Sequence, residues 1–296
     1  MLTGSIFIRK NWADIAQDMQ REHRHILSVV GVVMLLATAG VLVTLALRMD
    51  KAIESFIAEA LSYGLFLAVP VWYAFRRRDG KRKAIIVYLL FLAVMLINDW
   101  LIKGGLQGEL AASSRAASPR LLISMSMLLI WIVPLWMMRA HPVQARSIGL
   151  DFERAGYKIL YGALGGGILI SHLWVTLFYS ASPFRTKPGL YFLFTFCYEV
   201  GAQSLSEEIF FRGFLFNYLY NVRRVRVQWA IILVSLLNVS IYLVKFRATG
   251  GLYELLGPAF YAFVMAMLNA ILLRRLGGIL PGLILNVLFS MASVLR

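Results

Sequence analysis

The sequence is poor in charged residues, particularly acidic ones, and in cysteine. Only 15% of its 296 residues are charged, and lysine plus arginine outnumber aspartate plus glutamate by 30 to 15. Soluble domains carry about 25% charged residues, so this composition excludes a soluble globular enzyme as well as a disordered chain. The single cysteine, Cys197, can form neither an internal disulfide nor a CxxC metal site, which excludes a disulfide-rich secreted module.

Apolar residues instead make up 60% of the chain, and the mean hydropathy is +0.73. A helix that crosses a bilayer needs roughly 17–25 apolar residues. Nine runs meet or approach this length: Ile26–Leu47, Ala58–Phe75, Ala84–Ile102, Leu121–Met138, Ile159–Tyr179, Leu190–Leu219, Trp229–Val244, Leu255–Leu273 and Ile279–Leu295. They are too long and too uniformly apolar for barrel strands. The sequence therefore predicts an all-α, polytopic membrane helix bundle with about nine transmembrane helices, or eight if one short run does not span.

The basic residues are divided unequally between alternate loops, that is, between the two sides of the predicted membrane. If the N-terminus is cytoplasmic, the segments 1–25, 76–83, 139–158, 220–228 and 274–278 lie inside and contain 19 of the 30 basic residues. The segments on the other side contain 10, which is the asymmetry that the positive-inside rule requires. We therefore predict a cytoplasmic N-terminus. The basic loops favour a bacterial inner (plasma) membrane and fit an endoplasmic reticulum membrane less well. Anionic lipids at the cytoplasmic loops account for the net charge of +15. A nucleic-acid partner is not expected, because no basic face carries interleaved aromatic residues.

Three parts of the chain differ in character. Residues 1–25 form a cytoplasmic amphipathic lead, and residues 26–189 contain five predicted spans with few ionisable groups. Residues 190–296 contain four spans and concentrate polar side chains at membrane depth. Because charges inside a bilayer are costly, those that remain tend to mark a function or a pairing that holds helices together.

The sixth run contains the sequence EEIFFRGFLF, in which three charged residues interrupt an apolar helix. Glu208 and Arg212 are four residues apart and share a helix face in the favourable acid-first order, so we predict an ion pair. Glu207 points about 100° away and has no partner within its own helix. It could act as a general base if a water molecule reaches it. The alternative is that all three residues only hold helices together.

This sequence resembles the first motif, EExxxR, of the CPBP family, the CAAX prenyl proteases and bacteriocin-processing membrane endopeptidases. The resemblance covers about residues 190–295. It implies a protease-like core of four helices at the C-terminal end. It also implies that Glu207 is the carboxylate that activates water, with Glu208 and Arg212 as its supporting pair.

The two other family motifs are altered. In the register of FxxxH, the family phenylalanine is Asn238 and the histidine is Tyr242; in the register of HxxxN, the histidine is Asn286 and the asparagine is Ser290. No histidine occurs in residues 190–296, so we expect no metal site of the usual type and no cofactor. Tyr242 and Asn286 can donate hydrogen bonds to an oxyanion, but neither carries a proton near pH 7 as histidine does.

Along their helices, Glu207, Tyr242 and Asn286 lie at similar depths, within about 8 Å of one another at 1.5 Å per residue. If the register is right, these three side chains and Ser290 converge on one chamber within the membrane. Three functions remain open. The favoured one is a pseudoprotease or scaffold that binds a membrane protein or a membrane-anchored peptide. The second is an active intramembrane endopeptidase that uses Glu207 on a membrane-anchored or lipidated peptide. The third is a transporter or lipid-binding protein, which no inverted repeat supports.

Overall fold

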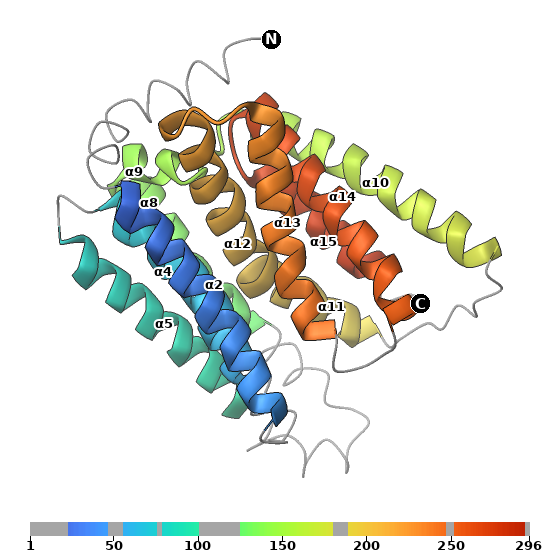
Figure 1. Cartoon of the computed structure of the whole chain (residues 1–296), viewed down its shortest axis with the longest axis horizontal. Helices are drawn as coiled ribbons and strands as arrows, with labels where there is room; N and C mark the ends of the chain where they lie inside the picture. Colours follow the sequence, from blue (N-terminus) through green and yellow to red (C-terminus); the bar gives the residue numbers. More distant parts are fainter. Residues whose placement is uncertain are drawn as a thin grey trace.

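The computed structural model describes residues 23–46, 56–75, 79–100, 125–179, 189–246 and 252–293. Throughout these ranges every regular element is a helix, and the helices form one bundle (Figure 1). The prediction of an all-α membrane helix bundle is therefore confirmed. Most of the predicted lead, residues 1–22, lies outside the described residues.

The predicted runs correspond to helices, and one short helix, α9, was not predicted. The N-terminal elements are α2 (His23–Ala46), η1 (Ala60–Gly64) continuing into α4 (Leu65–Ala74), α5 (Gly80–Trp100), η3 (Met127–Trp131) continuing into α8 (Ile132–Ala140), α9 (Pro142–Ser147) and α10 (Ala155–Tyr179). The C-terminal elements are α11 (Gly189–Tyr198), η4 (Glu199–Gln203), α12 (Ser204–Glu207), η5 (Glu208–Phe216), η6 (Tyr218–Val222), α13 (Val227–Phe246), α14 (Leu252–Leu276) and α15 (Leu280–Ser293).

The elements from α11 to η6 form one continuous helix over residues 189–222, hereafter the 189–222 helix. Three of its segments, η4, η5 and η6, are wound as a π-helix. Such wider turns are rare and occur frequently at functional sites. The predicted sixth span is therefore a single helix, but one with irregular winding along the stretch that contains the charged residues.

Aromatic packing fixes the 189–222 helix in the centre of the bundle. The Phe66 ring stacks on Phe210 at a centroid distance of 4.5 Å and meets Phe211 edge-on at 5.2 Å. Two turns after Phe66 and one turn after Phe210, Tyr73 stacks on Phe214 at 5.2 Å. Aromatic pairs of this kind add about 0.5–1.5 kcal/mol beyond their buried area. The FFRGF sequence therefore attaches the central helix to the Phe56–Ala74 helix along two turns.

A tight turn braces the same helix from the other side. Gly149 has φ +81°, and a side chain on Gly213 would collide with the carbonyl oxygen of Ile148, so the turn and the helix touch backbone to backbone. The Gly149 carbonyl accepts the backbone N–H of Ile279 at 2.9 Å. The buried Lys158 donates to the carbonyl oxygen and to Oδ2 of Asp151, each at 2.8 Å. Residues from both predicted parts thus support the central helix, and the proposed division at residue 189 stays a prediction.

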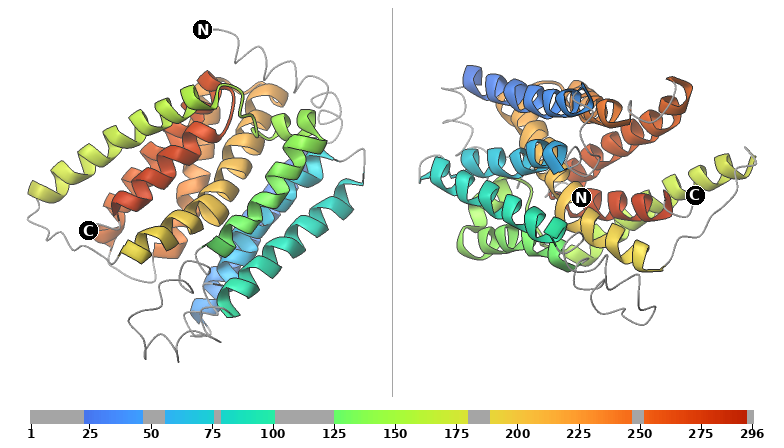
Figure 2. Two further views of the ribbon diagram at one scale, coloured as in Figure 1. Left: turned by 180° about the vertical axis from the view of Figure 1, so that it is seen from behind. Right: turned by 90° about the horizontal axis from the view of Figure 1, so that it is seen from below.

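Several helices expose large apolar side chains, as expected for a surface in contact with lipid. On α10, Ile168 is 69% and Phe178 75% exposed, and Figures 1 and 2 show this helix along the outside of the bundle beside α15. In the described ranges, three helices are long and apolar enough to cross a membrane: Phe56–Ala74, Ala155–Tyr179 and Leu256–Leu276. Four shorter apolar helices accompany them: Ser28–Gly40, Met127–Ala140, Val227–Leu243 and Leu280–Ala292. The chain is an integral membrane protein, while the number of nine spans stays a prediction.

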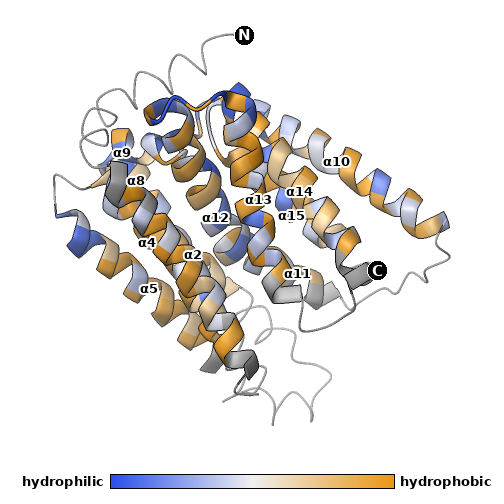
Figure 3. Cartoon of the chain, in the orientation of Figure 1, coloured by the Kyte–Doolittle hydropathy of each residue, from blue (hydrophilic) through white to orange (hydrophobic). Residues whose placement is uncertain are grey.

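The basic side chains gather at one end of the bundle, where the hydropathy colouring in Figure 3 is bluest. α5, α10, α13 and α15 begin at this end, and α14 and the 189–222 helix end there. The described basic residues at this end lie on these helices, on α8 and α9, and in the short connections between helices: Lys81, Arg82, Lys83, Arg139, Arg146, Arg154, Lys158, Arg223, Arg224, Arg226, Arg274 and Arg275. We call this the basic end.

Candidate functional site

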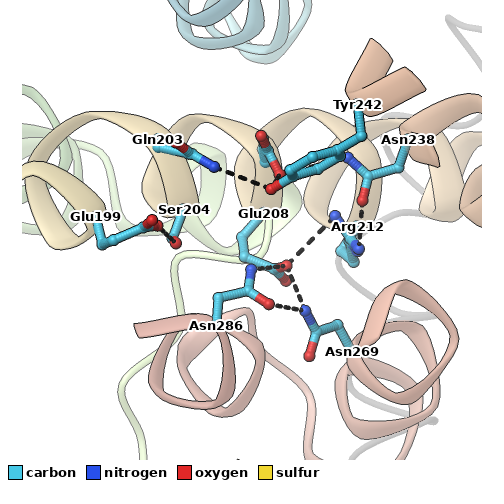
Figure 4. Close-up of polar contacts among 10 residues, drawn as sticks. Glu199, Gln203, Ser204, Glu208, Arg212, Asn238, Tyr242, Asn269 and Asn286 are labelled. Atoms are coloured by element: carbon cyan, nitrogen blue, oxygen red, sulfur yellow. Dashed lines mark hydrogen bonds and ion pairs between the residues drawn. The ribbon is translucent and has the colours of Figure 1, made fainter. Parts of the chain in front are cut away.

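The three charged residues of the central motif are buried inside the bundle. Glu207 is 3%, Glu208 0% and Arg212 1% exposed. They lie on η5 and on the last residue of α12, within the irregular part of the 189–222 helix. Figure 4 shows that side chains leave this helix on two faces, one toward α13 and one toward α14 and α15. Each face carries a hydrogen-bonded group, and Arg212 contacts both.

The face toward α14 and α15 is centred on Glu208. Its Oε1 accepts hydrogen bonds from Asn269 Nδ2 at 2.8 Å and from Asn286 Nδ2 at 3.0 Å. Arg212 Nη1 lies 3.4 Å from the same oxygen, so the predicted ion pair is confirmed. Asn269 Nδ2 also donates to Asn286 Oδ1 at 2.7 Å. One carboxylate oxygen therefore joins three helices.

Glu208 needs a neighbour without a side chain. A Cβ on Gly282, in the first turn of α15, would collide with Glu208 Oε2 and would lie 2.9 Å from its Cδ. Real Cβ atoms do not approach a carbon so closely, so a side chain there would displace the carboxylate. The glycine of the Leu-Pro-Gly sequence at the start of α15 thus provides the space that Glu208 occupies.

The face toward α13 is centred on Glu207. Its Oε2 accepts hydrogen bonds from the Tyr242 hydroxyl at 3.2 Å and from Asn238 Nδ2 at 3.4 Å. Gln203 Nε2 donates in turn to the Tyr242 hydroxyl oxygen at 2.9 Å. Arg212 connects the two faces, because its Nη2 donates to Asn238 Oδ1 at 3.0 Å while its Nη1 faces Glu208.

The structure brings together most of the predicted site, with one change of partner. Tyr242 contacts Glu207, which supports the register carried over from the FxxxH motif. Asn286 instead contacts Glu208, so the single chamber that we expected around Glu207 is divided between two carboxylates. Ser290 lies one turn beyond Asn286 on α15 and is partly buried. The catalytic roles of these residues stay predictions.

Three contributors were missed by sequence reasoning. Asn269 and Gln203 carry no family motif, and Asn238 was noted only as the replacement of a phenylalanine. Asn269 and Asn238 are both buried amides within otherwise apolar helices. Polar residues in such positions hydrogen-bond across helices. An isolated amide at membrane depth is therefore the sequence signal that could have identified these two residues. Gln203 is the last residue of the π-helical segment η4 and contacts Tyr242, a placement that periodicity of an ordinary α-helix does not predict.

The chemistry of the site rests on carboxylates, amides and a phenol. Across the described ranges, no three histidine, cysteine, aspartate or glutamate side chains gather in a way that could hold a metal ion; the expectations of no metal and no cofactor stay predictions. A buried carboxylate next to a phenol can hold or accept a proton. Amide and phenol groups can stabilise a developing negative charge. Histidine, the side chain whose charge ordinarily changes near pH 7, does not occur among these residues.

His172, outside the site, is hydrogen-bonded to a neighbouring helix. Its Nδ1 lies 2.8 Å from the Tyr261 hydroxyl of α14. This contact between α10 and α14 provides a hydrogen-bond partner for a histidine at membrane depth. Its position on α10 is therefore explained without a part in the chemistry of Glu207.

Comparison with known proteins supports the resemblance seen in the sequence. Residues 187–292 match the family model described as type II CAAX prenyl endopeptidase Rce1-like. The match covers the 189–222 helix, α13, α14 and most of α15, the four helices that carry the two polar groups. No curated protein and no solved structure matches the chain. The resemblance to CAAX-type membrane endopeptidases is therefore confirmed for this part of the chain.

Proposed function

We propose that this membrane protein uses a CAAX-protease-like core to bind a membrane protein or a membrane-anchored peptide, and that it does so as a pseudoprotease or scaffold. The family match over residues 187–292 supports the fold. The pattern of contacts around Glu207 supports the absence of efficient hydrolysis.

The observation that carries the proposal is the set of donors on Glu207. Its Oε2 accepts from a phenol, Tyr242, and from an amide, Asn238. No histidine occurs in residues 187–292. Phenol and amide groups do not exchange protons readily near pH 7, whereas general acid–base catalysis by a positioned side chain contributes about 10²–10⁴-fold. The family histidines that would orient the water or stabilise the oxyanion are thus replaced by groups that do not change charge near pH 7, which lowers the expected rate of hydrolysis.

One observation favours a second candidate, an active intramembrane endopeptidase in which Glu207 is the base. The EExxxR residues are all present, all buried and connected through Arg212. Tyr242 and Asn286 would then serve as oxyanion donors. In this reading the substrate is a membrane-anchored or lipidated peptide.

The proposal includes an orientation in the membrane. The N-terminus and the basic end face the cytoplasm, in a bacterial inner membrane, because the basic loops satisfy the positive-inside rule. Anionic lipid headgroups would then contact the basic end (Figure 3).

Affinity purification in mild detergent separates the two candidates. The wild-type protein, Glu207→Gln and a control, Glu153→Gln at the exposed Arg146–Glu153 pair, are expressed in the source cells and purified with whatever they bind. For a scaffold, we expect all three to retain the same partner at the same intact length. Full-length partner that accumulates only with Glu207→Gln, together with a shortened form in the wild type, would instead establish the endopeptidase.

A gain-of-function variant tests whether the site has lost only its histidines. Tyr242→His combined with Asn286→His restores the family residues at positions that contact Glu207 and Glu208 respectively. Cleavage of a lipidated reporter peptide by this variant, but not by the wild type, would support the pseudoprotease. Cleavage by the wild type, lost in Glu207→Gln, would refute it.

A further inference from the structure

Polar side chains continue from Glu207 toward the end of the bundle opposite the basic end. Tyr242 donates to Glu207 at 3.2 Å, and Gln203 donates to Tyr242 at 2.9 Å. About one turn before Gln203 on the same helix lies Tyr198, whose hydroxyl group forms a side-chain hydrogen bond with Glu59. We call Glu59, Tyr198, Gln203, Tyr242 and Glu207 the polar track.

Three helices contribute to the polar track, which makes it a feature of the fold rather than of one segment. Glu59 lies on the Phe56–Ala74 helix, and Tyr242 lies on α13. Tyr63, one turn after Glu59, is buried and interacts electrostatically with Tyr198, Glu207, Tyr242 and Glu59. Its phenol therefore lies beside the polar track between the Glu59 and Glu207 ends.

The direction of the polar track follows from the direction of the helices. Tyr198 precedes Glu207 by nine residues, or roughly 13 Å at 1.5 Å per residue. Glu59 lies three residues into the Phe56–Ala74 helix, whose other end leads to the basic segment 76–83. Gly189 at the start of α11 and Phe246 at the end of α13 lie at this same end, away from the basic end (Figure 1).

The polar track is partly exposed along its length, although Glu207 itself is buried. Glu59, Tyr198, Gln203 and Tyr242 are each partly exposed, while Glu207 is buried. Polar groups facing hydrocarbon are costly, and at membrane depth such groups line the protein interior or a water-filled space. In Figure 4, Gln203 and Tyr242 point toward each other between the 189–222 helix and α13.

We propose that the polar track is a route by which water reaches Glu207 from the end of the bundle opposite the basic end. Carboxylate, amide and hydroxyl groups along the polar track replace the hydrogen bonds of bulk solvent, so water and small hydrophilic solutes enter along it. Glu207 is then in contact with the aqueous phase opposite the basic end. This inference goes beyond the proposed function, because a scaffold and an endopeptidase could both use such a route.

Cysteine accessibility tests the route. Cys197 is replaced by alanine in the full-length protein, and Tyr198→Cys, Gln203→Cys and the control Phe196→Cys are introduced singly. Phe196 lies on the same helix at a similar depth but is 40% exposed and apolar, so its side chain faces lipid. Vesicles of known orientation are treated with a membrane-impermeant cationic methanethiosulfonate or, as a smaller reagent, silver ions. Remaining thiols are then counted after denaturation.

We expect Tyr198→Cys and Gln203→Cys to react about tenfold faster or more than Phe196→Cys, because the reactive species is the hydrated thiolate. They should react from the side opposite to that of Arg224→Cys, which marks the exposed basic end. Reaction of both positions no faster than Phe196→Cys with either reagent would overturn the route. Reaction from the Arg224 side would overturn its direction. Gel filtration of each variant shows that the folded protein was labelled.

Discussion

The ion pair between Glu208 and Arg212 gives the sharpest stability prediction. The Arg212 guanidinium is buried, with Nη1 3.4 Å from Glu208 Oε1 and Nη2 donating to Asn238. The substitution Arg212→Met keeps much of the side-chain volume but leaves the buried Glu208 carboxylate with only the amides of Asn269 and Asn286. Removing one partner of a buried pair commonly costs about 3–5 kcal/mol.

This cost is large compared with the stability of a typical protein. At about 1.4 kcal/mol per tenfold, it lowers the ratio of folded to unfolded protein by between about 100-fold and about 4000-fold. Since natural proteins are stable by only about 5–15 kcal/mol, we expect Arg212→Met to reduce the amount of folded protein in the membrane. The measurements are abundance in membranes and the melting temperature in detergent.

Two further variants separate the charge effect from the packing effect. Adding Glu208→Gln to Arg212→Met removes the unpaired charge and keeps an acceptor for the two asparagines, so it should recover part of the loss. Arg146→Met breaks the exposed pair with Glu153 and should change stability by no more than about 1 kcal/mol. If Arg212→Met behaves like Arg146→Met in both measurements, the pair does not stabilise the fold and the reasoning is refuted.

Two other predictions follow from the close contact at Gly282 and from the basic loops. Gly282→Ala would place a Cβ against the Glu208 carboxylate and should lower the melting temperature. The control Gly167→Ala adds a Cβ that meets nothing within 4 Å, so it should leave the melting temperature unchanged or raise it through better helix propensity. Equal melting temperatures for the two variants would contradict the contact. Reporter fusions at Lys81 and at Arg115 should report opposite sides of the membrane, and the same side for both would make the topology between the second and fourth spans wrong.

The amino-acid sequence alone determined the fold class and the identity of the main charged residues. Long apolar runs leave helices as the only spanning element, because every backbone group in lipid needs a partner within its own segment. The four-residue spacing of Glu208 and Arg212 was enough to predict their pairing, because residues four apart share a face on any helix. These features depend on local geometry, so they can be predicted from the order of residues in the sequence.

Only the tertiary structure decided how the polar residues divide between the two carboxylates. The sequence placed Tyr242 and Asn286 at similar depths, but depth does not specify the side of the 189–222 helix on which α13 and α15 pack. That packing assigns Tyr242 to Glu207 and Asn286 to Glu208, and it adds Asn269 from α14, which no motif marked. The space for the Glu208 carboxylate at Gly282 arises in the same way, because it comes from the approach of α15 to a residue 74 positions earlier in the chain. Contacts of this kind depend on how helices distant in sequence meet, and periodicity within one helix contains no information about them.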